Sequence, residues 1–245
     1  MSFDPNQSTV ARTRVDTAEI DVGLRQYMLR VYNYMALGVA FTGAVSLLVA
    51  SNEQLLFMVA GTPLIWVVFL GILGMGWFAP RLMLSGSTTT AHVCFWIYAA
   101  LWGLGIAPLL YRVGVIQGAP EDVARAFFIA TATFGGMSLF GYTTKKNLGP
   151  IGTFLAMAAI GMLIAVLINA FLVQSWGFEL VLSVGIVLLF SVITAWQTQA
   201  IKSFYYAADA ADVATRKAIF GAFMLYGAFV TIFIWILNIL SLLRE

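Results

Sequence analysis

The sequence is short of charged residues and of cysteine, and each shortage excludes a class of protein. Only 10% of the 245 residues are charged, against about 25% in soluble domains. The 13 Lys and Arg residues and 11 Asp and Glu residues give a net charge of +2. No dense basic cluster is present of the kind that binds nucleic acid, so we expect no nucleic-acid partner. The single cysteine, Cys94, allows no intrachain disulfide.

The sequence also lacks the residue sets that catalysis or metal binding requires. There is one histidine, His92, and the apolar stretches contain almost no acidic residue. Neither a Ser-His-Asp triad nor a set of metal ligands can be assembled from these residues. We therefore expect no catalytic residue, no metal site and no cofactor, and a protein that is not an enzyme. His92 and Cys94 are interpreted as structural residues.

Apolar residues, in contrast, are abundant and fall into long runs. They make up 61% of the chain, which is more apolar surface than a soluble fold of this size can bury. A helix that spans a bilayer needs roughly 20 apolar residues. The runs predict an all-α membrane protein with seven transmembrane helices, and lipid as the partner of most of the surface. The predicted spans are about 31–50, 55–78, 91–111, 123–142, 151–173, 178–198 and 218–243.

The N-terminal region is more polar than the rest. Residues 1–15 are predicted to be a disordered cytoplasmic tail, and residues 16–245 a single membrane domain. A short amphipathic helix on the membrane surface is predicted to lead into the first span. Its apolar stripe has spacings of three and four residues and consists of Ile20, Leu24, Tyr27, Met28 and Val31.

The positions of Lys and Arg predict the orientation, because cytoplasmic segments near span ends collect basic residues. With the N-terminus inside, ten of the 13 basic residues lie on the cytoplasmic side and three, Arg112, Arg125 and Arg244, on the other. We therefore predict a cytoplasmic N-terminus. If the last apolar run were re-entrant, the C-terminus would be cytoplasmic too.

The polar residues predicted within or beside the spans are neutral: Asn169, Thr194, Gln197, Gln199 and Asn238. Transporters and proton pumps usually keep ionisable residues near the midplane, so their near absence is informative. The neutral groups either form hydrogen bonds between helices or line a polar cavity, and the sequence leaves both readings open. Small residues predict helix-packing faces, namely Gly135, Gly136 and Gly141, Gly152 with Ala156, and Gly161 with Ala165 and Asn169.

Three strings in the second half of the chain are distinctive. Residues 138–148 read SLFGYTTKKNL, residues 194–202 read TAWQTQAIK and residues 217–226 read KAIFGAFMLY. These strings closely resemble the Bax inhibitor-1 family of membrane proteins in its bacterial branch. The match covers nearly the whole chain. The resemblance implies a seven-helix bundle with the last helix in the centre, in the bacterial cytoplasmic (inner) membrane. It also implies, for some members, a pH-sensitive calcium leak latched by two facing aspartates in the sixth and seventh spans.

This sequence departs from that family pattern at the latch itself. Gln197 stands where the family has the first aspartate, and Ala228 stands where it has the second. Such a latch cannot titrate, and it offers no carboxylate to a calcium ion. The candidate pore or latch positions are Gln197, Ala228, Thr194, Gln199 and Asn169.

Two functions follow from the resemblance and from this departure. The first is a cation leak pathway, for calcium in particular, that lacks the acidic pH latch. The second is a non-catalytic scaffold or modulator bound to another membrane complex, such as a membrane AAA protease.

Overall fold

The computed structural model describes the backbone of residues 5–244 and the side chains of residues 22–244. This part of the chain is helical and contains no strand. Seven of its helices are long and apolar enough to cross a membrane, as predicted. The helices are α1 (Pro5–Ala50), α2 (Glu53–Ala60), α3 (Leu64–Ser85), α4 (Thr88–Tyr111), α5 (Pro120–Thr143), α6 (Gly152–Ile168), α7 (Trp176–Ser203) and α8 (Ala211–Leu242).

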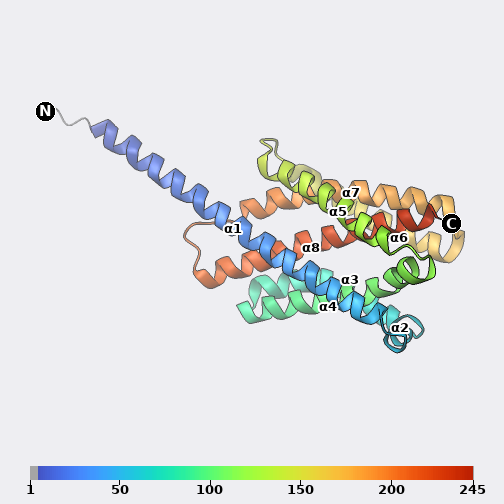
Figure 1. The fold of residues 1–245 in the computed structure, drawn as a ribbon. Helices are drawn as coiled ribbons and strands as arrows, with labels where there is room; N and C mark the ends of the chain where they lie inside the picture. The colour runs from blue at the N-terminus through green and yellow to red at the C-terminus, as the bar shows by residue number, and fades with distance from the viewer. Residues whose placement is uncertain (1–4, 245) are drawn as a thin grey trace.

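The long helices run alternately up and down one bundle, so the two termini lie at opposite ends (Figure 1). One end holds the α3–α4, α5–α6 and α7–α8 connections. We call it the basic end, because Arg25, Lys145, Lys146, Lys202 and Lys217 lie at or near it. The opposite end holds the C-terminus.

The last helix, α8, lies in the centre of the bundle (Figure 1), and it packs against α1, α3, α4, α5 and α7. It is unbroken over 32 residues, so the last apolar run is long enough to cross a bilayer completely. Its large side chains are enclosed on all sides, and Leu225, Tyr226, Ile232 and Leu237 have no exposed surface. The expectation of a central last helix is therefore confirmed.

The first helix differs from the prediction. It is one continuous helix of 46 residues, about 69 Å long at 1.5 Å per residue. The predicted apolar stripe is real from Leu24 onward, but Tyr27, Met28 and Val31 are buried in the bundle core rather than laid on a membrane surface. Residues 1–4 of the predicted tail, 1–15, lie outside the described residues. The backbone of the rest of this tail is helical and belongs to α1, which begins at Pro5. No proline interrupts the chain between Pro5 and Ala50.

The predicted second span, 55–78, is also wrong at its start. The chain forms the short helix α2, breaks at residues 61–63, and begins α3 at Leu64. Pro63 immediately precedes α3, because its ring cannot be accommodated inside a helix that continues from α2. The spanning helix is therefore shifted toward the basic end and finishes at Ser85, with Pro80 inside it.

Close helix packing occurs at some of the predicted glycines and not at others. A Cβ atom on Gly141 would lie 2.2 Å from the backbone oxygen of Ala195 on α7, and one on Gly152 would lie 2.7 Å from the Trp196 ring. Gly135, Gly136 and Gly161 have open space beside them instead. The small residues of α5 and α6 thus fix these helices to α7 only near the basic end.

Replacing Gly141 with alanine should lower the stability of the bundle. The new methyl group would collide with the backbone of α7, which cannot move away as a flexible side chain can, and overpacking of this kind costs about 1–3 kcal/mol. Gly161→Ala is the matched control, since it adds the same methyl group to α6 in open space. Thermal unfolding in detergent should show a lower midpoint for the first variant only; equal midpoints would contradict the packing described here.

Candidate functional site

The contact between α7 and α8 contains the positions at which the latch was predicted. The side chain of Ile201 on α7 lies against Gly221 on α8, and Asn238 on α8 donates a hydrogen bond to Ser183 on α7 over 3.2 Å. These two contacts fix the antiparallel register of the pair. In this register Gln197 and Ala228 lie within about one helical turn, about 5 Å along the axis.

Gln197 is half-buried, and its Oε1 atom is fully enclosed without a hydrogen-bond partner among the described residues. Ala228 is buried beside α7, with only 2% of its surface exposed. Thr194, one turn along α7, is also buried, and its hydroxyl donates to the Phe190 carbonyl of its own helix over 2.8 Å. Helix α7 therefore carries an enclosed, unpaired amide oxygen where the family pattern has an acid.

Gln199 and Asn169 lie elsewhere and have other partners. Gln199 accepts a hydrogen bond from the Leu148 N–H over 2.7 Å and donates to the Lys146 carbonyl over 2.8 Å. It thereby holds the turn between α5 and α6 against α7. Asn169 lies at the far end of α6, where its Oδ1 atom accepts from the Ser175 N–H over 3.1 Å. Of the five predicted positions, Gln197, Thr194 and Ala228 lie at nearby levels of the α7–α8 pair in this register, whereas Gln199 and Asn169 lie elsewhere.

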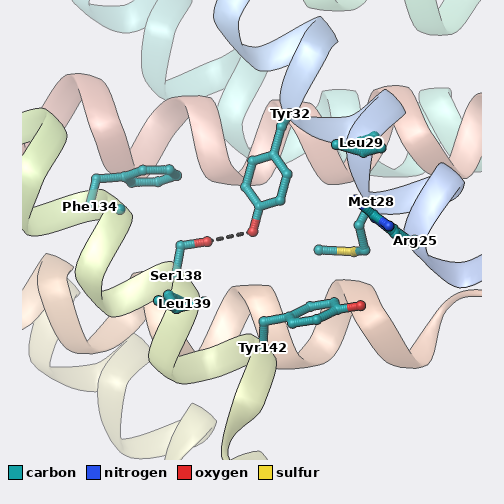
Figure 2. A pocket seen from close by; sticks show the side chains of 9 residues that line it. Arg25, Met28, Leu29, Tyr32, Phe134, Ser138, Leu139 and Tyr142 are labelled. Carbon is teal, nitrogen blue, oxygen red and sulfur yellow. Dashed lines mark hydrogen bonds between the residues drawn. The ribbon is translucent and has the colours of Figure 1, made fainter. Parts of the chain in front are cut away.

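A chain of three hydroxyl groups crosses the bundle near this contact. Tyr32 on α1 bonds Ser138 on α5 over 2.6 Å (Figure 2), and Ser138 bonds Thr198 on α7 over 3.1 Å. A second set links Thr42 on α1 to Tyr226 on α8 over 2.6 Å. Neutral pairs of this kind satisfy hydroxyl groups that would otherwise be unpaired in an apolar interior.

The Tyr32–Ser138 pair forms part of the wall of a cavity of about 460 Å³ between α1 and α5. Figure 2 shows its side chains converging from the two helices. We call this cavity the α1–α5 groove, and it is lined by Arg25, Met28, Leu29, Tyr32, Phe134, Gly135, Ser138, Leu139 and Tyr142. Sequence reasoning missed it, because nothing in the sequence indicates that these two helices stand apart.

Charged groups missed by sequence reasoning gather at the C-terminal end. Arg244 binds the carboxylates of Asp122 and Glu121 at the start of α5, and Asp122 is buried although it precedes the predicted span 123–142. The hydrogen bond to Asp122 raises the pKa of the Arg244 guanidinium above its ordinary value. On α7, Glu179 accepts a hydrogen bond from Asn238 over 2.9 Å. All three carboxylates lie in the first turn of a helix, where the helix dipole favours negative charge.

These features define a multi-pass helical membrane protein. Residues 24–245 match the profile of the family described as "Inhibitor of apoptosis-promoting Bax1", and the chain belongs to this family, the Bax inhibitor-1 family. It is 36% identical to the uncharacterized protein RP147 of Rickettsia prowazekii over 92% of this chain and 93% of that one. It is 36% identical to an uncharacterized Caulobacter vibrioides protein over 92% of each chain. It is 31% identical to the inner membrane protein YbhL of Escherichia coli K12 over 89% of this chain and 92% of YbhL.

Two glutamines on α7, two residues apart, should respond oppositely to replacement by leucine. Gln199→Leu removes both hydrogen bonds that hold the α5–α6 turn and should destabilise the protein by about 1–3 kcal/mol. Gln197→Leu removes an enclosed oxygen that has no partner, so stability should stay the same or rise. Unfolding midpoints in detergent measure both effects, and a larger loss for Gln197→Leu would show that its amide is paired after all.

Proposed function

We propose that this protein is a leak pathway for cations, calcium in particular, and that its gate between α7 and α8 is electrically neutral. The observation that carries the proposal is the enclosed, unpaired Oε1 atom of Gln197 at the position of the family's first latch aspartate. Family membership supports the choice of an ion pathway. The proposal makes the chain a passive conduit rather than an enzyme.

The chemistry of an amide explains why such a gate would differ from an acidic one. An amide oxygen is a hard ligand of the type calcium accepts, but it brings no charge. It therefore holds a cation weakly enough to release it. Two carboxylates in its place would share a proton and titrate as a coupled pair. With Gln197 and Ala228 there is no proton to exchange, and opening does not depend on pH.

The burial of the neighbouring side chains indicates what opening requires. Thr194 and Ala228 have almost no exposed surface, so an ion can pass Gln197 only if α7 and α8 separate at this level. The Ile201–Gly221 contact lies one turn toward the basic end, and the Asn238 hydrogen bonds lie toward the other. Separation between these two anchors is a local movement.

Calcium entry into proteoliposomes tests the proposal directly. We expect flux through the wild type that changes little between about pH 5 and pH 8, because no group at the gate titrates in this range. Gln197→Asp with Ala228→Asp should make the flux pH-dependent by creating a coupled pair. Calcium-sensitive dye inside the vesicles, with the same pH on both sides, gives the readout.

The control is Ala228→Asn in the wild-type background, which adds similar volume at position 228 without charge. Its flux should remain flat with pH, although its amplitude can change. Absence of flux in the wild type at every pH would refute the leak pathway. Flux that stays flat in the double aspartate variant would instead refute the juxtaposition of positions 197 and 228.

A second candidate function is a scaffold or modulator of another membrane complex, such as a membrane AAA protease. The observation that favours it is the outward face of α6, a helix that packs mainly against α7. Gly161 on this face has open space around it, which suits close approach of a helix from another protein. Gly161→Leu should abolish co-purification of such a complex in mild detergent. Recovery of the chain alone from the wild type would count against this function.

A further inference from the structure

We propose that the α1–α5 groove binds an anionic phospholipid, with one acyl chain along its apolar wall and the phosphate group at Arg25. The inference concerns a different part of the molecule from the α7–α8 gate. It holds whether or not the protein conducts ions.

The groove lies where only lipid or another membrane component can fill it. Its outer rims carry Leu29 and Leu139, which are 53% and 64% exposed on helices that face the hydrocarbon. Its volume of about 460 Å³ falls within the range of about 300–1,000 Å³ typical of ligand pockets. An empty apolar groove of this size would forfeit the dispersion contacts of its walls.

The groove is apolar at one end and basic at the other. Phe134 lies at the deep end, while Arg25 and the Tyr142 hydroxyl lie at the end toward the basic end of the bundle (Figure 2). From Phe134 to Tyr142 the groove extends about 12 Å along the α5 axis. This arrangement matches a lipid, whose chain lies in the hydrocarbon and whose phosphate lies at the interface.

The charges favour an anionic headgroup. Among the side chains of residues 22–244, no carboxylate lines the groove, and Arg25 is exposed there. A second cation, Lys202, stands beside the groove with its Nζ atom 4.9 Å from the centre of the Tyr142 ring. Guanidinium groups bind phosphate through paired hydrogen bonds, and basic pockets between membrane helices bind anionic headgroups.

The inner wall suits a hydrocarbon chain rather than water. The Tyr32 and Ser138 hydroxyls bond each other over 2.6 Å, so neither needs a water molecule from the groove. Gly135 contributes no side chain, and a Cβ atom built on it meets nothing within 4 Å. The missing side chain leaves the space that the acyl chain would occupy.

The adjacent glycines of α5 provide a matched pair of variants. Gly135→Leu places a leucine in the groove, whereas Gly136→Leu adds the same side chain in open space outside the lining. Native mass spectrometry measures how much phosphatidylglycerol and how much phosphatidylcholine, with identical acyl chains, stay bound to each purified protein. We expect the wild type and Gly136→Leu to retain phosphatidylglycerol in preference, and Gly135→Leu to lose it.

Charge variants test the headgroup separately. Arg25→Gln should weaken phosphatidylglycerol binding about tenfold, the effect of losing one charge-assisted hydrogen bond, and leave phosphatidylcholine binding nearly unchanged. Arg81→Gln is the control, an exposed arginine near the basic end but outside the groove. Since Arg25 is exposed, this arm remains decisive even if Gly135→Leu does not fold.

Three results would overturn the proposal. One is equal retention of both lipids by the wild type. Another is the same behaviour of the two glycine variants. The third is a wild-type dimer that Gly135→Leu dissociates, which would identify a second copy of this chain as the occupant. None of these results depends on calcium flux, so failure of this inference and failure of the proposed function are distinguishable.

Discussion

The bundle depends on the enclosure of α8 by five other helices in a solvent that offers no hydrogen bonds. Each polar group on this helix needs a partner within the protein. Tyr226 has Thr42 in the middle of the helix, Asn238 has Glu179 nearer the C-terminal end, and Ser241 has Arg112 at that end. At the basic end, Lys217 pairs with Asp209 over 2.6 Å. These polar contacts hold α8 at both ends and at its centre, and the apolar contacts between them fix its rotation.

The proposed neutral gate differs from the polar contacts of this central helix. Tyr226, Asn238 and Ser241 on α8 each have a side-chain partner, whereas the enclosed Oε1 atom of Gln197 on α7 is one of the few buried side-chain atoms that have none among the described residues. Natural cores rarely leave such an atom unpaired without a functional reason. The two sites proposed here also divide the molecule: the gate lies on the inner face of α7, while the lipid groove lies between α1 and α5. The Ser138–Thr198 hydrogen bond of 3.1 Å joins α5 to α7 between them, so the helix that lines the groove also supports the helix that carries Gln197.

Local patterns in the sequence predicted the helices well, but they predicted poorly the contacts between residues far apart in the chain. Apolar runs predicted all seven spanning helices, because bilayer thickness fixes their length, and the TAWQTQ string located the neutral position at Gln197. The stripe of Tyr27 and Val31 was visible, but periodicity alone does not say whether a stripe faces lipid or protein. Gln199 holds the α5–α6 turn through backbone groups about fifty residues away in the chain. Asn169 accepts a hydrogen bond from the Ser175 N–H in the turn after α6. No local sequence pattern predicts either contact. The groove results from helices that stay apart, which leaves no mark in either helix alone.

The position of α8 has a consequence for biosynthesis. Chains are made from the N-terminus, so six membrane-crossing helices leave the ribosome before the one around which they pack. Until residues 211–242 arrive, the side chains of Thr42, Ser183 and Glu179 lack their α8 partners, Tyr226 and Asn238. The bundle can therefore be completed only when the last helix has been made, and a chain without its last 35 residues, 211–245, lacks the central helix of the bundle. We expect cellular quality control that recognises unpaired polar groups in the membrane to degrade such a truncated chain.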